Sequence, residues 1–221
     1  MFSIAIDGPA GAGKSYLADK LAEHYNLIHV DTGALYRTVG LHVCRLGIAK
    51  EETDKIVAAL ATLTVSLTFE NGVQQVLLNG EAVGDKIRTP EIAAYASAVS
   101  AIPEVRTFLL ETQRKLAREQ GVIMDGRDIG TVILPDADVK LFLVADNRAR
   151  AKRRLAEFLA KGIETTLEEV LKDVESRDHN DSTRKTAPLK PADDAIMLDN
   201  SELTPDETVA AAIAIIEEKR K

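Results

Sequence analysis

Residues 6–21 read IDGPAGAGKSYLADKL, and this stretch decides how the rest of the chain is interpreted. The spacing G-x-x-x-x-G-K-[ST], typical of phosphate-binding loops, is filled here by Gly8, Gly13, Lys14 and Ser15. Small residues let backbone N–H groups curl around an anion, and a helix N-terminus adds partial positive charge. The lysine of such a loop supplies charge to the outer phosphates, and the serine hydroxyl ligates Mg2+. A glycine-rich turn that binds nothing is the alternative.

The flanking residues favour the phosphate-binding interpretation. Residues 2–6 form a short apolar run suited to a strand that is buried on both faces. Leu17, Leu21 and Tyr25 recur at four-residue spacing, as a helix that begins near Lys14 requires. The expected phosphate-binding residues are Gly8, Pro9, Ala10, Gly11, Ala12, Gly13, Lys14, Ser15 and Tyr16, with Ser15 as the metal ligand.

Composition suits a soluble protein with a sizeable core and is compatible with a small nucleotide as ligand. The 221 residues suit one compact domain, or one core with inserted subdomains. The net charge of −7 argues against a nucleic acid polymer as partner, because neutralising its phosphates needs a basic surface. Cys44 is the only cysteine, which excludes an intrachain disulfide and favours a reducing compartment. The N-terminus lacks a basic leader and no apolar run has membrane-spanning length, so we expect a cytoplasmic protein.

Apolar runs that alternate with helical patterns predict an α/β fold with a parallel five-stranded sheet flanked by helices. The predicted strands cover residues 2–6, 28–30, 122–124, 139–144 and 195–198. Four of them run into an aspartate: Asp7, Asp31, Asp125 and Asp199. Ligands of open α/β sheets bind beyond the carboxyl ends of strands, so these aspartates are site candidates. Helix N-capping is the alternative for each.

A second pattern interrupts the parallel core. Residues 63–69 alternate apolar and polar side chains, which predicts a strand with one polar face. The run VQQVLL at 73–78 is flanked by Asn71-Gly72 and Asn79-Gly80, two dipeptides typical of hairpin turns. These features predict a small antiparallel meander inserted into the parallel core.

The third feature is a concentration of arginine. Six of the 14 arginines lie between positions 148 and 184: Arg148, Arg150, Arg153, Arg154, Arg177 and Arg184. Capping boxes at Thr166 and Thr204 predict helix starts, whereas the breakers in residues 177–194 predict a mobile loop. An arginine-rich helix with a mobile loop suits a lid that closes over transferring phosphates. A solvated helix surface is the alternative.

Polar residues at two strand ends complete the candidate site. Asp125 ends a strand beside the phosphate-binding loop, the usual place for a carboxylate that organises Mg2+. Arg127 and Asp128 follow it, and a turn-stabilising ion pair between them is the alternative to a role in binding. None of the four histidines is an obvious general base. The lack of an obvious general base suits an acceptor that is itself a phosphate, because its oxygens are already ionised.

Four blocks of sequence, residues 4–15, 31–40, 124–145 and 177–201, resemble the bacterial cytidylate kinases, a P-loop nucleoside monophosphate kinase family. The resemblance runs through nearly the whole chain. It implies a P-loop NTPase-type core with an inserted NMP-binding subdomain, approximately residues 32–104, which carries the antiparallel sheet. It also implies an arginine-rich lid, approximately residues 147–187. The implied reaction transfers the γ-phosphoryl group of ATP to CMP or dCMP with Mg2+, and we expect a monomer.

The resemblance implies roles for matching positions. The acceptor phosphate would be held by Thr32, Arg37, Arg127 and Arg184. The sugar would face Arg177 and Asp181, and the cytosine would be recognised by Ser97, Arg106 and Asp128. The lid over ATP would contain Arg150 and Arg154. The expected catalytic set is therefore Lys14, Asp125, Arg127, Arg150, Arg154 and Arg184.

One departure from the family and two rival functions qualify this interpretation. The loop continues as Ser15-Tyr16 where the family commonly has Gly-Thr, although Ser15 still offers a hydroxyl at the metal-ligating position. A kinase for shikimate or dephospho-coenzyme A is the nearest rival, but it would not explain the cytosine-binding set. A GTP-dependent switch is the other, and the Asn-Lys-x-Asp loop that recognises guanine is missing from the sequence.

Overall fold

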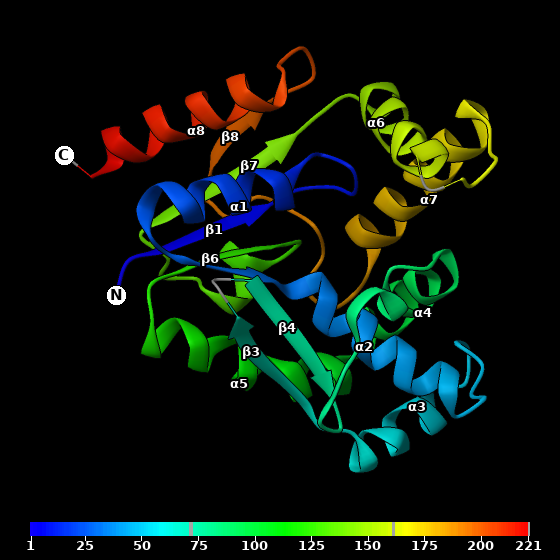
Figure 1. The fold of residues 1–221 in the computed structure, drawn as a ribbon. Coiled ribbons are helices and arrows are strands. Elements are labelled where there is room, and N and C mark those ends of the chain that lie inside the picture. The colour runs from blue at the N-terminus through cyan, green and yellow to red at the C-terminus, as the bar shows by residue number, and fades with distance from the viewer. Residues whose placement is uncertain (71–72, 161, 221) are drawn as a thin grey trace. The chain divides into compact units, whose positions relative to one another are not determined.

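The computed structural model describes residues 1–70, 73–160 and 162–220 of the chain. One sheet has the strand order β2-β6-β1-β7-β8, and its strands are β1 (Ser3–Asp7), β2 (Ile28–Asp31), β6 (Val122–Gly126), β7 (Val139–Val144) and β8 (Ile196–Asp199) (Figure 1). β1 pairs in parallel with β7, and β7 with β8. The predicted α/β fold and all five predicted strands are confirmed.

The chain forms two compact units, one of Met1 with Ile28–Val122 and one of Phe2–Leu27 with Ile123–Lys221. The helices of the second unit are α1 (Lys14–Tyr25), α6 (Asn147–Ala160), α7 (Leu167–Thr183) and α8 (Pro205–Lys219), with a π-helical turn, η3 (Ile129–Ile133). Its main core includes Ile4, Ile6, Leu17, Leu21 and Leu141, all nearly inaccessible to solvent. Burying each such side chain stabilises the fold by about 1.5–3 kcal/mol.

The loop between β1 and α1 depends on glycine at its first position. Gly8 has a φ of 148°, and a Cβ there would lie 2.2 Å from the carbonyl oxygen of Leu143 in β7. Gly13, with a φ of 91°, precedes the first residue of α1. Both φ values lie in a region that residues with a side chain rarely adopt. The spacing of glycines in the motif therefore reflects backbone geometry as well as room for a phosphate.

The first unit contains the predicted antiparallel meander. Its elements are α2 (Thr32–Arg45), α3 (Thr53–Ala59), η1 (Leu60–Thr62), β3 (Val65–Glu70), β4 (Val73–Leu78), β5 (Glu81–Ala82), η2 (Gly84–Ile87), α4 (Pro90–Ser100) and α5 (Pro103–Glu119). β3, β4 and β5 form an antiparallel sheet in that order, which confirms the prediction. Asn79 and Gly80 both have positive φ, as the predicted turn requires. The other predicted turn, Asn71-Gly72, lies outside the described residues.

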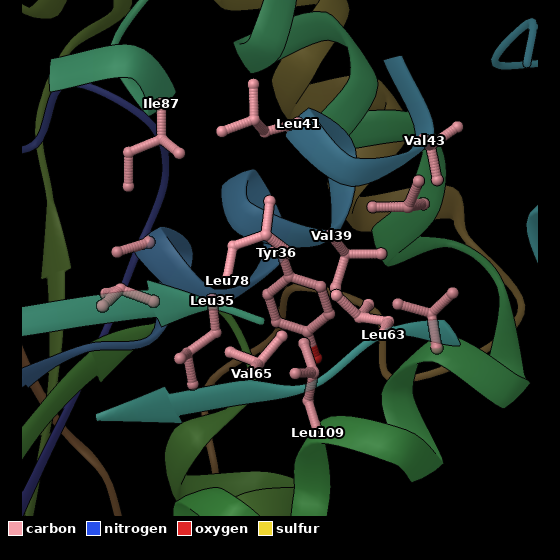
Figure 2. Close-up of a cluster of buried hydrophobic side chains, with 14 of the residues drawn as sticks. Leu35, Tyr36, Val39, Leu41, Val43, Leu63, Val65, Leu78, Ile87 and Leu109 are labelled. Carbon is pink, nitrogen blue, oxygen red and sulfur yellow. The ribbon is translucent and has the colours of Figure 1, made fainter. Parts of the chain in front are cut away.

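A separate apolar core holds this unit together. Figure 2 shows Tyr36 of α2 pointing toward Val65 of β3 and Leu109 of α5. All three side chains are at least nine-tenths buried. The core therefore fastens the meander to α2, the helix that carries the predicted phosphate-binding Thr32 and Arg37.

The structure corrects the loop predicted at residues 177–194 in its first part, because α7 continues as far as Thr183, whereas residues 184–194 form neither helix nor strand. The helix begins with the predicted capping box at Thr166, and its Val170 and Val174 pack against α6. It ends where the backbone leaves the helical region, three residues before Ala187 takes a φ of 50° ahead of Pro188. Arg177 and Asp181 thus lie on a helix. The capping box at Thr204 is also confirmed.

No helix among the described residues is both long enough and apolar enough to span a lipid bilayer.

Candidate active site

The P-loop, residues 8–15, holds its lysine inside the protein. Lys14 is 6 % exposed, and its Nζ donates a hydrogen bond to the carbonyl of Pro9 at 2.7 Å. Burial lowers the pKa of this lysine to about 7, and the nearby charge of Arg127 acts in the same direction. An anion bound in the loop would counter both effects, so the site favours a ligand rich in negative charge.

The next residue, Ser15, contacts the strand-end carboxylate that the sequence predicts at Asp125. The Ser15 Oγ donates to Asp125 Oδ2 at 2.9 Å, and Asp125 is buried. A hydroxyl and a carboxylate are hard oxygen ligands, and Mg2+ commonly takes only one or two ligands from the protein. No group of three or more His, Cys, Asp or Glu residues in the described ranges could hold a metal. The pair fits a Mg2+ ion whose other ligands come from phosphates and water.

Tyr16, the unusual residue after Ser15, points away from the loop. Tyr16 is 44 % exposed, and its hydroxyl donates to Asp206 of α8 at 3.1 Å. The side chain therefore ties the first turn of α1 to the start of α8, and only the backbone of Tyr16 is available to the loop.

Beyond β6, two arginines and two aspartates form a chain of ion pairs. Arg127 Nε donates to Asp181 Oδ2 at 2.8 Å, and Arg184 Nη2 donates to Asp128 Oδ1 at 3.4 Å. Arg184 Nη1 also lies 3.8 Å from Asp181 Oδ1. The first two pairs join the segment after β6 to α7 and to its C-cap, Arg184, and the third connects Arg184 to Asp181 within this region. Arg127 and Asp128 do not form the turn-stabilising ion pair given above as the alternative. Arg127 pairs with Asp181 of α7, and Asp128 pairs with Arg184, the C-cap of α7.

Asp7, at the end of β1, anchors the same segment. Its two carboxylate oxygens accept hydrogen bonds from the backbone N–H groups of Ile129 and Gly130, both at 2.7 Å. Burial raises the pKa of Asp7 to about 6 despite these two bonds. The sequence places Asp7 among the site candidates, but its contacts are with the backbone that follows Asp128. The short apolar strand before the P-loop therefore also holds a second site loop in place.

The arginines of α6 have different surroundings. Arg150 is fully buried and touches the P-loop. Arg154 lies 3.5 Å from Asp173 of α7, with its guanidinium 4.8 Å from the centroid of the Phe158 ring. Arg177 Nε lies 3.3 Å from the same Asp173. These arginines therefore do not form the solvated helix surface given above as the alternative, because Arg154 and Arg177 share the carboxylate of Asp173 on α7.

In the first unit, Asp31 holds the predicted phosphate ligand Arg37. Arg37 Nη2 donates to Asp31 Oδ2 at 2.6 Å, while the N–H of Ala34 donates to the other oxygen at 3.0 Å. Asp31 is thus the N-cap of α2, the alternative given above, and orients Arg37 as well. The Gln74 amide of β4 makes two hydrogen bonds with the backbone of Asp31, at 2.9 and 3.2 Å. Gln74 carries no sequence signal, because its role depends on how the meander docks.

The remaining predicted residues of this unit lie on α2, α4 and α5. Thr32 is buried in the first turn of α2. Arg106 donates to the carbonyl of Ser100 at 3.1 Å, and its guanidinium lies 5.4 Å from the centroid of the Tyr36 ring. Ser97 lies one turn before the end of α4, half-buried. Stacking on Tyr36 fixes the direction in which Arg106 extends.

A P-loop whose lysine, serine and strand-end aspartate meet on a parallel sheet defines a P-loop nucleotide-binding protein. The chain belongs to the cytidylate kinase family, whose profile matches residues 4–218. A cytidylate kinase of Caldicellulosiruptor saccharolyticus is 47% identical over 96% of this chain and 94% of its own. One of Limosilactobacillus reuteri is 50% identical over the same shares. An uncharacterized protein of Eubacterium ventriosum shares the fold, with a TM-score of 0.51 at 16% identity over 98% of this chain and 99% of its own.

Proposed function

We propose that this protein transfers the γ-phosphoryl group of ATP to CMP or dCMP, giving ADP and CDP or dCDP. The observation that carries the proposal is the family match, which extends through the P-loop and through every residue expected to bind the acceptor. The protein is accordingly an ATP-dependent kinase. We expect it to act as a cytoplasmic monomer on small nucleotides, in keeping with its net charge of −7.

On the donor side, the P-loop backbone and Lys14 bind the β- and γ-phosphates of ATP. The ammonium, now bonded to the Pro9 carbonyl, transfers its hydrogen bonds to phosphate oxygens. Ser15 and Asp125 would hold Mg2+, which neutralises phosphate charge when bound. These groups stabilise the charge that spreads over the transferring phosphoryl group, so they act through position and charge.

On the acceptor side, arginines receive the phosphate of CMP. Arg37 is one of them, and its buried Nε has no hydrogen-bond partner among the described residues of its unit. Arg127 and Arg184 are the others, oriented by Asp181 and Asp128. The acceptor oxygen is already ionised at neutral pH, so the protein aligns it without removing a proton.

The test is a panel of nucleoside monophosphates in a coupled assay of ADP release. We expect ADP release to follow added CMP and dCMP with far higher kcat/KM than UMP, AMP or GMP. Shikimate and dephospho-coenzyme A serve as acceptors for the rival kinases, and GTP without acceptor serves for a switch. ADP release that does not depend on CMP, or that is more efficient with shikimate or dephospho-coenzyme A, would overturn the proposal.

The lid, residues 147–187, should close over bound nucleotides. We expect slower amide hydrogen exchange in α6 and α7 when a non-hydrolysable ATP analogue and CMP are both present, because closure buries their exposed faces. The helix α8 provides an internal reference within the same spectra. Exchange in α6 and α7 that stays the same with both ligands would identify them as static surface helices.

A further inference from the structure

Arg150 is the largest of the side chains that are almost fully buried, with 2 % exposure. Its Nε donates to the carbonyl of Ala145 at 3.0 Å, and its Nη1 donates to the carbonyl of Ala10 in the P-loop at 2.9 Å. Its Nη2 donates to Asn147 and to the carboxylate of Asp178 in α7. Every nitrogen of the guanidinium therefore has a protein acceptor, and four of its five N–H groups are used in these bonds.

The bond to Ala10 fixes the direction of a neighbouring N–H group. The carbonyl of Ala10 and the N–H of Gly11 belong to one planar trans peptide, so they point in opposite directions. Arg150 contacts the loop from the carbonyl side, and a Cβ on Gly11 would lie 3.4 Å from its own Cβ. By holding the oxygen, Arg150 turns the Gly11 N–H toward the other side of the loop, where phosphates bind.

The bond to Asp178 links the same guanidinium to α7. Asp178 lies next to Arg177 and one turn before Asp181, the two residues expected to face the acceptor sugar. Arg150 and Asp178 are 2 % and 23 % exposed, and a hydrogen bond between charged groups in such surroundings is strong. One arginine thus joins the donor loop to the helix expected to bind the acceptor.

We propose that Arg150 is a positioning residue: it aims the Gly11 N–H at the donor phosphates and, through Asp178, ties the P-loop to α7. The proposal rests on the proposed function for the identity of the two ligands. It replaces the expectation that Arg150 stabilises the transferring phosphoryl group as a mobile lid arginine.

Asn200 offers a comparison within the same loop. Its Nδ2 donates to the carbonyl of Ala12 at 2.9 Å, and Arg153 of α6 donates to Asn200 Oδ1 and to its carbonyl. By the same peptide geometry, Asn200 orients the N–H of Gly13. Asn200 therefore braces the P-loop as Arg150 does, but none of its described hydrogen bonds reaches α7.

The experiment measures affinity for a non-hydrolysable ATP analogue without turnover, with and without saturating CMP. We expect Arg150→Lys and Asn200→Ala each to weaken analogue binding about tenfold, the loss of one well-placed hydrogen bond. When CMP is absent, Asp178→Asn should weaken analogue binding less than these two substitutions do. The exposed Lys152→Ala on α6 is the control and should bind as the native chain does.

A double-mutant cycle tests the link to α7. We expect Asp178→Asn to cause little further loss of analogue affinity in a chain that already carries Arg150→Lys. In a chain that carries Asn200→Ala it should cause its full loss, because Asp178 contacts Arg150 and has no described contact with Asn200. Additive effects in the Arg150–Asp178 pair would overturn the link. Native-like analogue affinity in Arg150→Lys, with a hundredfold loss of kcat, would show that Arg150 touches the phosphoryl group instead.

Two features keep these outcomes distinct. If Arg150→Lys does not fold, Asp178→Asn, a change at a partly exposed carboxylate, still reports on the link through the effect of CMP on analogue affinity. Failure of the proposed function would appear separately, as native protein that releases no ADP in response to CMP. Analogue binding in the absence of CMP does not depend on the identity of the acceptor.

Discussion

Lys14→Met should lower kcat by about 10³-fold, because the transferring phosphates lose the one ammonium held inside the P-loop. Methionine has similar length and no charge, so it occupies the space of the lysine without its hydrogen bond to Pro9. The measurement is ADP release at saturating ATP and CMP. The matched control is Lys20→Met, which replaces a half-exposed lysine of the same helix and should keep native turnover. Native turnover in Lys14→Met would remove Lys14 from the mechanism.

The stability of the same variant has a pH dependence of definite sign. The pKa of Lys14 is about 7 in the folded protein and 10.5 without the fold, so the unfolded chain binds more protons between these values. The free energy of unfolding therefore rises with pH through this window, and the penalty for the buried charge is fully present below pH 7. Lys14→Met removes that penalty. Its melting temperature should exceed that of the native chain most at pH 6 and least near pH 10; the reverse order would contradict the lowered pKa.

Asp128 should decide between cytosine and uracil, so that Asp128→Ala lowers kcat/KM for CMP by about tenfold to a few hundredfold and leaves UMP less affected. Cytosine presents an amino donor where uracil presents a carbonyl acceptor. A buried carboxylate can accept a hydrogen bond from the amino group of cytosine, whereas the carbonyl of uracil offers it no donor. Asp128 is 3 % exposed and forms an ion pair with Arg184.

A second substitution sharpens this test. Asp128→Asn replaces one carboxylate oxygen by an amide that can donate to the uracil carbonyl, so UMP should gain relative to CMP. Asp136→Ala is the control, because Asp136 is an exposed carboxylate in the same segment of chain. Equal efficiency of the native protein with CMP and UMP would defeat the role of Asp128. The same result would defeat the roles proposed for Ser97 and Arg106.

Much of the fold could be predicted because its signals are local. The apolar strands, the glycine spacing of the P-loop, the Asn79-Gly80 turn and the capping box at Thr166 are each decided by residues a few positions apart. The structure contains all of them. The error at residues 177–183 has the opposite origin. Asp, Asn, Ser and Thr favour turns in isolation, yet these residues extend a helix that is already fixed by packing against α6.

For the candidate site, the sequence predicts which types of residue lie at the strand ends, but not which of them contact one another. That Asp125 meets Ser15 follows from the motif and the sheet. The hydrogen bond from the Ile129 backbone to Asp7 joins residues 122 positions apart, and the one from Asp31 to Gln74 joins residues 43 positions apart. Sequence patterns report periodicity and spacing, and neither contains such contacts.

The P-loop motif of this protein does not determine the conformation of the loop by itself. Its carbonyls at Pro9, Ala10 and Ala12 are each held by a different side chain, and only Lys14 belongs to the motif itself. Arg150 and Asn200 enter from segments more than a hundred residues further along the chain. A short peptide with the motif, or the motif transplanted onto another strand and helix, would carry the glycines and the lysine without the groups that aim its N–H donors. The anion-binding shape is a property of the whole second unit, and substitutions far along the chain can erase it while the motif stays intact.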